Sequence, residues 1–466
     1  MESSRGISSR GTIVSSSSSE KSEFREQNTI EIPLNSFGEK LISPKTGKVI
    51  KIAFFDYPDV FEDFYPHYGV SLEDFSFWHN TANHAWLGII QDNIGKVSWY
   101  MPCIKPKKGE VVHKKIGFTL KYLPSSFLHR LLWKSFYLPS FAWKWQRYYR
   151  KYAVVASYLA PLSFSLIRAL IRDKPDILFV QDYCSGKFDI LVLFSKLLRI
   201  PLLTFHSGST SDKYLGKFLR KYTIPKADWI FSSGKKETHL LESQFHIPNN
   251  RITIIRPPID TITYQIRDKT TACLKTNLNP TRRYLLFVGR FEDAVKRISA
   301  IIYAFKSHAE KYKDVDLLII GSGKDENDLK GLAKELVPGR VIFPGWITDE
   351  MDKSWYYNAS ECLILASWRE ASPAVIGEAF SCGIPLISSR VGGISDMVLE
   401  DQTGWLFEAG DDEALGSCME KVMANPEKII QMKPKIREIA EKTVSYETIE
   451  KSLRKGFESV FNSKTN

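Results

Sequence analysis

The chain has 466 residues, of which 43% are hydrophobic and 25% charged, a composition typical of a globular protein with room for two domains. The sequence has no run of about 18 uninterrupted apolar residues, which argues against a membrane-spanning helix. The six cysteines are scattered without a CxxC pair, so neither a disulfide scaffold nor a zinc site is indicated. This cysteine usage predicts a cytoplasmic protein.

The net charge of +11 is concentrated in one segment. Residues 105–151 contain twelve Lys or Arg and one acid, Glu110, among many aromatic residues. Basic, aromatic, amphipathic segments bind anionic membrane surfaces, so this segment predicts a peripheral association with a membrane. The alternative is that the aromatic residues belong to a core beneath a solvated basic face. Because no recognised binding motif accompanies the charge, we do not expect nucleic acid as a partner.

In chain order, residues 1–46 are rich in serine and poor in apolar residues, which predicts a disordered tail. A transit peptide is the weaker alternative because Glu2, Glu20, Glu23 and Glu26 dilute the first part of this stretch. Residues 47–262 then alternate apolar runs with helical patterns, which indicates a parallel α/β domain. Expected strands are 51–55, 96–101, 176–181, 201–206, 228–231 and 251–255; expected helices are 79–94, 153–172 and 188–198.

Residues 263–283 lose apolar periodicity and predict a linker. A second α/β series occupies 284–440, with strands expected at 284–288, 315–320, 340–343, 361–366, 385–388 and 405–408. The final stretch, 441–466, predicts a helix that packs back on the first domain. The fold class expected is therefore α/β, with two Rossmann-like domains that face each other across a cleft and bind ligands at the carboxyl ends of their strands.

One helix of the second domain carries the most informative pattern. Ser372 is a good N-cap and Pro373 a good first residue, and Gly383 is a stop signal, which predicts a helix over 373–382. Free N–H groups at its start favour a phosphate. Glu370 precedes the cap, and Glu378 lies roughly 9 Å along the helix axis. This order suits a nucleotide sugar, with sugar, diphosphate and ribose in a row, although two solvated glutamates would give the same sequence.

The other strand ends of this domain add cations and glycines. Arg290 and Lys296 follow the first strand, and both side chains suit a diphosphate. The second strand ends in Gly321-Ser322-Gly323, which alone is weak evidence for a ligand site. Gly345 and the pair Gly392-Gly393 follow later strands. Glycine turns at successive strand ends of one domain together indicate a cofactor or donor site.

These residues resemble the group 1, or family 4, retaining glycosyltransferases of the GT-B fold over residues 284 to about 425. The resemblance rests on Gly289-Arg290 with Lys296, Gly321-Ser322-Gly323, Gly345, the Glu370–Glu378 spacing, Ala379, Gly383, Pro385, Gly392-Gly393 and Gly404.

The resemblance implies roles for individual residues. Arg290 and Lys296 would hold the diphosphate and stabilise its charge, and Glu370 would bind hydroxyls of the donor sugar. Glu378 would bind the ribose. His206, which on its own would read as a structural residue at a strand end, would reach the donor from the first domain. The remaining implied donor-binding positions are Gly289, Gly321, Gly323, Trp346, Ile347, Ser372, Ala374, Val375 and Gly393.

The reaction implied is transfer of a hexosyl group from a nucleotide sugar to a hydroxyl of a saccharide or lipid-linked acceptor, with retained configuration, in polysaccharide or glycolipid synthesis. A nucleotide-sugar epimerase or hydrolase, or a non-catalytic binding module, is the alternative. We expect no cofactor and no metal, because the DxD-like run 314–316 heads a buried strand at the end opposite the ligand. The expected location is the cytoplasm, with peripheral binding at the cytoplasmic face of a membrane.

Two departures from the family pattern stand out. The loop after the first strand, 56–69, lacks the pair of glycines that often lies where donor and acceptor meet. Arg297 stands where a glycine often follows the lysine. The first departure puts the acceptor side in doubt, and the second is mild.

Overall fold

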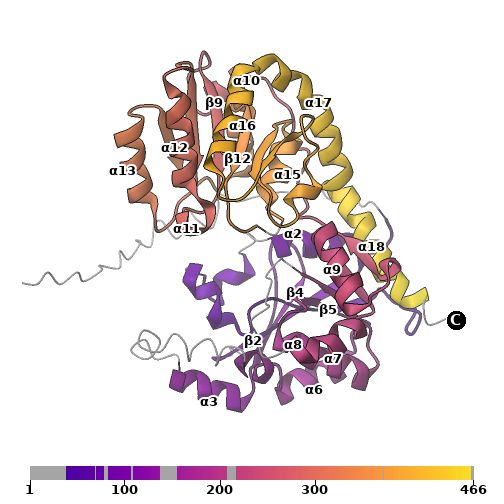
Figure 1. Ribbon diagram of the computed structural model, residues 1–466. Coiled ribbons are helices and arrows are strands. Elements are labelled where there is room, and N and C mark those ends of the chain that lie inside the picture. The colour runs from indigo at the N-terminus through magenta and orange to yellow at the C-terminus, as the bar shows by residue number, and fades with distance from the viewer. Residues whose placement is uncertain are drawn as a thin grey trace, which may run out of the picture. The chain divides into compact units, whose positions relative to one another are not determined.

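The computed structural model describes residues 38–462, except 69, 78–81, 106–108, 137–154, 207–216 and 371. The described residues form two sheets with helices around them (Figure 1). The first sheet has eight strands in the order β3-β4-β2-β1-β5-β6-β7-β8, and only β3 is antiparallel to its neighbour within this described part. The second has six strands in the order β11-β10-β9-β12-β13-β14, all paired in parallel.

The elements of the N-terminal sheet lie between residues 51 and 254. Its strands are β1 Lys51–Phe55, β2 Lys96–Cys103, β3 Glu110–Val112, β4 Thr119–Pro124, β5 Ile177–Gln181, β6 Leu202–Phe205, β7 Trp229–Ser232 and β8 Ile252–Ile254. Its longer helices are α2 Ala82–Ile89, α3 Phe127–Phe136, α6 Phe164–Asp173, α7 Gly186–Leu198, α8 Lys217–Thr223 and α9 Lys235–Phe245.

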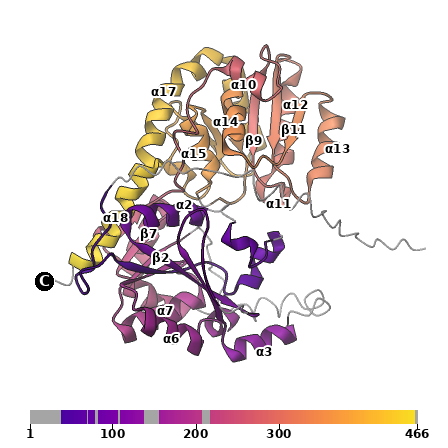
Figure 2. The same ribbon diagram turned by 180° about the vertical axis from the view of Figure 1, so that it is seen from behind.

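The C-terminal sheet begins after residue 282. Its strands are β9 Arg283–Val288, β10 Val315–Ile320, β11 Val341–Gly345, β12 Cys362–Leu365, β13 Leu386–Ser389 and β14 Gly404–Phe407. Its helices are α10 Lys269–Lys275, α11 Asp293–Lys296, α12 Ile298–Ala309, α13 Glu326–Leu336, α14 Glu350–Ala359, α15 Ala374–Ser381, α16 Asp412–Ala424 and α17 Pro426–Thr443, and α18 Tyr446–Asn462 follows. Figures 1 and 2, seen from opposite sides, show helices on both faces of this sheet.

The parallel strands are continuous apolar runs because helices cover both faces of each sheet. The strand β10 (VDLLII) is buried at every position, and so is β5 (ILFVQ). The predicted parallel α/β class is therefore confirmed, and the predicted strands lie within a few residues of the observed ones. The register places the carboxyl ends of neighbouring strands side by side, with Gln181 opposite Phe205 and Ile320 opposite Val288.

The basic aromatic segment contains two strands that the sequence did not reveal. β3 and β4 lie inside 105–151, and β4 pairs in parallel with β2. Tyr122 is buried in the core, and Lys121 is buried in ion pairs with Glu110 and Asp173. For this part, the core alternative to a membrane-binding stretch is correct, because Leu120 and Tyr122, two positions apart on β4, both lie in the buried core. The remainder of the segment, 137–154, lies outside the described residues.

Three expected boundaries differ from the structure. The helix expected over 153–172 is interrupted at Pro161, which cannot continue it, and α6 begins at Phe164. Residues at the end of the expected tail already hydrogen-bond to the domain, since Leu41 N–H donates to the carbonyl of Ile94 at 2.8 Å. The expected linker contains α10, which Asp268 caps by accepting the N–H of Thr271.

The last helix, α18, packs on the N-terminal sheet. Ile449, Leu453 and Phe457 lie in the same buried cluster as Phe179 and Phe231 of that sheet. Figures 1 and 2 show this helix in yellow beside β7 and α9. Helix α18 therefore completes the core of the N-terminal domain. Across the described residues, no helix is both long enough and apolar enough to cross a membrane.

Candidate functional site

The turn after β9 carries the two predicted cations. The Arg290 side chain is exposed and makes no hydrogen bond or ion pair with any described residue. Lys296 ends the short helix α11, whose first residue, Asp293, is held by the side chain of Ser299 at 2.6 Å. Arg290 is therefore free to meet an anion, and Lys296 is held in place by its own helix.

Lys296 and Glu370 form an ion pair. The Lys296 Nζ lies 2.5 Å from Glu370 Oε1, although the two residues are 74 positions apart. The Ser367 hydroxyl donates to the same oxygen at 2.7 Å. The Glu370 side chain is 9% exposed, and its Oε2 has no partner among the described residues. The structure thus brings together two of the predicted residues and leaves one carboxylate oxygen able to accept another hydrogen bond.

The helix start differs from the prediction by one residue. α15 begins at Ala374, and Pro373, with extended backbone angles, occupies the N-cap. Ser372 is therefore not the cap, and no side chain among the described residues accepts a first-turn N–H. The prediction failed because Pro373 was assigned to the first helical position, where it is common, while its ψ of 127° keeps it outside the helix. Gly383 does end the helix region, with a φ of +71°.

Glu378 is buried in a network of side chains. Its Oε2 accepts from the Tyr357 hydroxyl at 2.7 Å, and its Oε1 lies 3.3 Å from the Lys353 Nζ. Lys353 also pairs with Glu350 at 3.1 Å, and the Tyr264 hydroxyl donates to Glu350. Burial raises the pKa of Glu378, which Lys353 and Tyr357 partly oppose. The structure therefore excludes the alternative in which Glu378 is a solvated surface residue.

The glycines at the strand ends allow two turns to touch. At Gly321, with a φ of +143°, a side chain would collide with the carbonyl of Gly289, and at Gly323 it would collide with the backbone of Phe291. Both glycines are therefore required by packing between the β9 and β10 ends, whatever ligand lies there. Trp346 is 61% exposed after β11.

Two further predicted positions lie on this half of the chain. Ile347 packs against the C-terminal core, and Gly393 precedes a short 3-10 turn at residues Ile394–Asp396. Ala374 and Val375 form the first turn of α15 and are partly buried against the same core.

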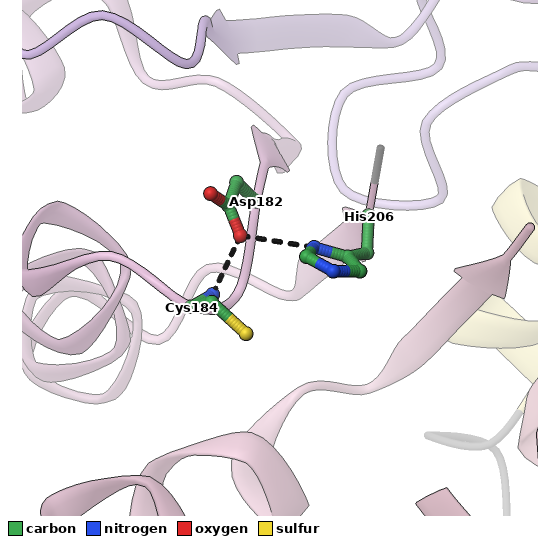
Figure 3. A group of neighbouring side chains, drawn as sticks. All are labelled: Asp182, Cys184 and His206. Atoms are coloured by element: carbon green, nitrogen blue, oxygen red, sulfur yellow. Dashed lines mark hydrogen bonds and ion pairs between the residues drawn. The ribbon is translucent and has the colours of Figure 1, made fainter. Parts of the chain in front are cut away.

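His206 follows β6 in the N-terminal half and is 8% exposed. Its Nδ1 lies 3.0 Å from Asp182 Oδ1, and the same oxygen accepts the N–H of Cys184 at 2.8 Å (Figure 3). The Tyr183 ring lies 4.7 Å from the imidazole, centroid to centroid. Asp182, Cys184 and His206 also form the one group of three among the described residues whose ligand atoms, all within 4.8 Å, could hold a metal ion.

The DxD-like run is structural, as expected. Asp316 is buried and its carboxylate pairs with Arg282 and with Arg340, at 2.8 Å from the Nε of Arg340. Asp314 is half-exposed, 3.5 Å from Arg283. Both aspartates lie at the amino end of β10, whereas Gly321 follows its carboxyl end.

Comparisons with known proteins agree with this arrangement. Residues 268–442 match the family model described as "Glycosyl transferases group 1", and residues 146–262 match "Glycosyltransferase Family 4". The N-acetyl-alpha-D-glucosaminyl L-malate synthase of Bacillus anthracis is 30% identical over 310 residues, which cover 63% of this chain and 78% of the synthase. The chain belongs to the group 1 glycosyltransferases. It therefore transfers a sugar from a nucleotide-sugar donor.

Other relatives give the same family and fold. An uncharacterized glycosyltransferase of Haemophilus influenzae is 28% identical over 280 residues, or 59% of this chain and 74% of that protein. The structure of Anabaena HepE in complex with UDP is 14% identical, with a TM-score of 0.64 over 88% of this chain and 100% of that one. Sucrose-phosphate synthase from Thermosynechococcus elongatus is 18% identical, with a TM-score of 0.60 over 89% and 100%. The predicted GT-B fold class is confirmed.

In this glycosyltransferase, the loop without paired glycines is held by a buried lysine that the sequence did not single out. Lys187, in the first turn of α7, donates to the carbonyls of Asp56, Tyr57 and Pro58, the last two at 3.0 and 2.8 Å. Burial lowers the pKa of Lys187. A cavity of about 10 Å³, roughly one water, is the space left beside it. No local pattern could have revealed this contact, because the partners are about 130 residues apart.

The second departure from the family pattern, Arg297 in place of a glycine, also has a structural explanation. Arg297 has a φ of +52°, in the left-handed region where glycine is favoured. Its guanidinium lies 4.6 Å from the centre of the Trp368 ring and donates to Asp412 at 2.6 Å. These contacts offset the backbone cost of about 1 kcal/mol and tie the Lys296 turn to the loop that carries Glu370.

Proposed function

We propose that this glycosyltransferase is a retaining, metal-independent enzyme that moves a hexosyl group from a nucleoside diphosphate sugar to a hydroxyl of a saccharide or lipid-linked acceptor. The observation that carries the proposal is the Lys296–Glu370 ion pair beside the unpartnered Arg290. A cation and a carboxylate held together in this way offer adjacent positions for a phosphate and for sugar hydroxyls. The names of the relatives, which include an N-acetylglucosaminyl transfer and a complex with UDP, support a UDP-sugar as the first donor to test.

The two cations would act on the leaving group. As the bond between the anomeric carbon and the phosphate oxygen breaks, a second negative charge develops on the terminal phosphate of the nucleoside diphosphate. Arg290, free of other partners, and Lys296, released from Glu370 by the phosphate, would stabilise that charge in place of a metal ion. The acceptor oxygen would bond to the same face of the anomeric carbon and pass its proton to the departing phosphate oxygen.

The two glutamates would fix the rest of the donor. Glu370 Oε2, which has no partner among the described residues, would accept from hydroxyls of the transferred sugar. Glu378 would accept from the ribose, with Tyr357 and Lys353 holding its orientation. The first-turn N–H groups of Ala374 and Val375 would meet the phosphate, since no described side chain caps them.

Three substitutions test the proposal: Arg290→Ala, Lys296→Ala and Glu370→Gln. Each should lower the rate of transfer at least about 100-fold, the range for removing one preformed charge contact to a transition state. Their melting temperatures should stay within a few degrees of the wild type because the three side chains are at the surface or partly exposed. Lys435→Ala, which removes an exposed cation on α17, is the matched control. Near-wild-type transfer in all three variants would contradict the proposal.

The donor and the metal requirement are measured on the same protein. Thermal-shift screening of UDP-, GDP- and ADP-sugars, each with EDTA, identifies the donor; transfer is then followed with saccharide and lipid-linked acceptors. We expect the same rate in EDTA as with added magnesium. A rate restored only by a divalent ion would contradict the metal-independent chemistry, and anomeric NMR of the product would decide retention against inversion.

We also propose that the enzyme binds the cytoplasmic face of an anionic membrane through its N-terminal half. Phe127 and Leu131 on α3 and Phe164 on α6 are exposed by 76%, 51% and 92%, in or near the basic segment 105–151. Exposed rings and leucines beside Lys and Arg suit a charged lipid surface. Flotation with anionic vesicles should be lost in a Phe127→Ser, Phe164→Ser double variant and kept in Ile430→Ser, a matched exposed site on α17. Equal flotation of both would contradict the assignment.

A further inference from the structure

We propose that Asp182 is a positioning residue for His206: it fixes the imidazole through Nδ1, so that Nε2 faces an oxygen of the nucleotide-sugar donor. The inference rests on the proposed function for the identity of that oxygen. The contact between the two side chains itself is part of the structure, at 3.0 Å (Figure 3).

The fold brings the two residues together at one sheet edge. Asp182 directly follows β5 and His206 directly follows β6, and these strands pair in parallel with Gln181 opposite Phe205. The N–H of Asp182 donates to the Phe205 carbonyl at 2.7 Å, which extends the ladder by one residue. The side chains of the pair are 6% and 5% exposed. Each is therefore held by backbone as well as by its partner.

The contact fixes the proton on the ring. An ionised carboxylate only accepts hydrogen bonds, so Nδ1 must carry a proton. Nε2 has no partner among the described residues and is the nitrogen left for a ligand. Tyr183, packed on the ring, is itself anchored by its hydroxyl at 2.5 Å from Glu237. The contact with Asp182 therefore limits rotation of the imidazole, and the Tyr183 ring limits its tilt.

The charges around the ring favour its protonated form. Burial lowers the pKa of His206. The hydrogen bond and the charge of Asp182 together raise this pKa by more than burial lowers it, so the net shift is upward. Glu237 on α9 adds to the rise, and Arg220 on α8 opposes it. The protonated ring offers Nε2–H as a donor, which suits the anionic phosphates of a nucleotide sugar better than a neutral acceptor nitrogen would.

The backbone of Asp182 is strained. Its φ of +70° lies in the left-handed region, where a residue other than glycine costs roughly 1 kcal/mol. A glycine would relieve the strain but would remove the carboxylate that His206 and the N–H of Cys184 both use. Strain retained where a side chain is needed is typical of a functional position.

Asp182→Asn isolates the charge. Asn tolerates the left-handed conformation, and its carbonyl oxygen can still accept the N–H of Cys184. The substitution removes the negative charge beside His206. Asp176→Asn is the matched control, because Asp176 is a buried carboxylate at the opposite end of the same strand, bonded to Ser43 and to the N–H of Lys51.

The first measurement needs no activity. In ¹⁵N-histidine NMR of the full chain, with the His206 signals assigned by their absence in His206→Gln, wild-type Nδ1 should be protonated and the midpoint of titration should lie above that of a free histidine. Asp182→Asn should lower that midpoint by about 1 unit or more, whereas Asp176→Asn should leave it in place. An unchanged midpoint in Asp182→Asn would overturn the proposal even if transfer activity is never found.

The second measurement is the pH profile of transfer. Because the protonated ring is the active form, the alkaline limb should move to lower pH in Asp182→Asn, with kcat/KM at pH 7.5 lowered about 10-fold or more. A lower melting temperature with no shift in the alkaline limb of the pH profile would show that Asp182 has only a structural role, and would overturn the proposal. One zinc per chain that is lost in Cys184→Ser would show that the three side chains form a metal site instead, and would also overturn it.

Discussion

The carboxyl ends of the two sheets are built in opposite ways. At the C-terminal sheet, the turns after β9 and β10 are glycine-rich and present an unpartnered Arg290 and a partly exposed Lys296. At the N-terminal sheet, the same edge is filled by side chains: Asp56 accepts from Tyr65 and from Asn83, and Lys187 caps the loop from below. One edge is open and cationic, while the other is closed by its own hydrogen bonds.

The difference shows how one fold divides its work. An open edge with an unpaired arginine suits a ligand that enters and leaves with its negative charge. A closed edge suits a loop that must keep one shape, because Asp56 and the carbonyls of the loop already have hydrogen-bond partners and have little to gain from moving. The substitutions below test whether the two edges respond as this division requires.

The largest effect is expected at the closed edge, from Lys187→Met. The change leaves three carbonyls without their donor and Asp56 without its nearest cation, and should cost about 3 kcal/mol or more in unfolding free energy. Lys196→Met, an exposed position on the same helix, is the control and should change stability little. Urea unfolding measures both. A stable Lys187→Met protein would mean that the loop does not depend on this lysine.

Lys353→Met tests a closed network on the other half. Glu350 and Glu378 would then face each other without the cation between them, which should cost about 3 kcal/mol in unfolding free energy and weaken nucleotide binding as well. Calorimetric titration with the nucleotide measures the affinity, and denaturant unfolding measures the free energy of unfolding. Lys330→Met, which removes an exposed pair with Glu326, is the comparison variant. Unaltered nucleotide binding would show that Lys353 does not contribute to the donor site.

Glu378→Gln should separate binding from stability. The amide can still accept from Tyr357, and Lys353 keeps Glu350, so we expect melting to change by only a few degrees. Loss of charge-assisted bonds to the ribose should weaken nucleotide affinity about 10-fold, or roughly 1.4 kcal/mol. Fluorescence titration with the nucleotide measures it, and kcat at saturating donor should fall less than affinity. A larger fall in kcat than in affinity would assign Glu378 to the chemistry.

The smallest effect concerns pH at the closed edge. Burial raises the pKa of Asp59 to about 7 from its ordinary value of 3.8. The folded state then binds the proton more tightly than the unfolded state, so this group lowers stability as pH rises between about 4 and 7. Asp59→Asn should raise the melting temperature by about 2–4 °C at pH 8 and leave it unchanged at pH 4. Asp74→Asn, on the surface of the same segment, should follow the wild type at both pH values.

Much of the C-terminal half was predictable because its signals are local. Apolar runs give its strands, and Lys296 and Glu370 follow strands that the parallel register places close together. The sequence placed Ser372 at the cap, since a serine before a proline fits that position equally well. Only the backbone angles of Pro373 decide between the two.

The N-terminal half was less predictable because its decisive contacts are distant in sequence. Nothing near Lys187 indicates that its ammonium reaches carbonyls about 130 residues earlier. Tyr122 and Lys121 lie in a segment so rich in charge that the alternation of a buried strand was hidden. His206 was identified by resemblance alone, and its partner Asp182 carries no motif; an aspartate directly after a buried strand was the one available hint.

The position of α18 bears on how the chain is made. The N-terminal sheet is complete at Ile254, yet the helix that covers Phe179 and Phe231 ends at Asn462. At typical rates of synthesis, the ribosome needs roughly 10–40 s to add the intervening residues. During that interval the nascent first domain exposes an aromatic face that only the last helix can cover. The first domain therefore finishes folding only after α18 has been made.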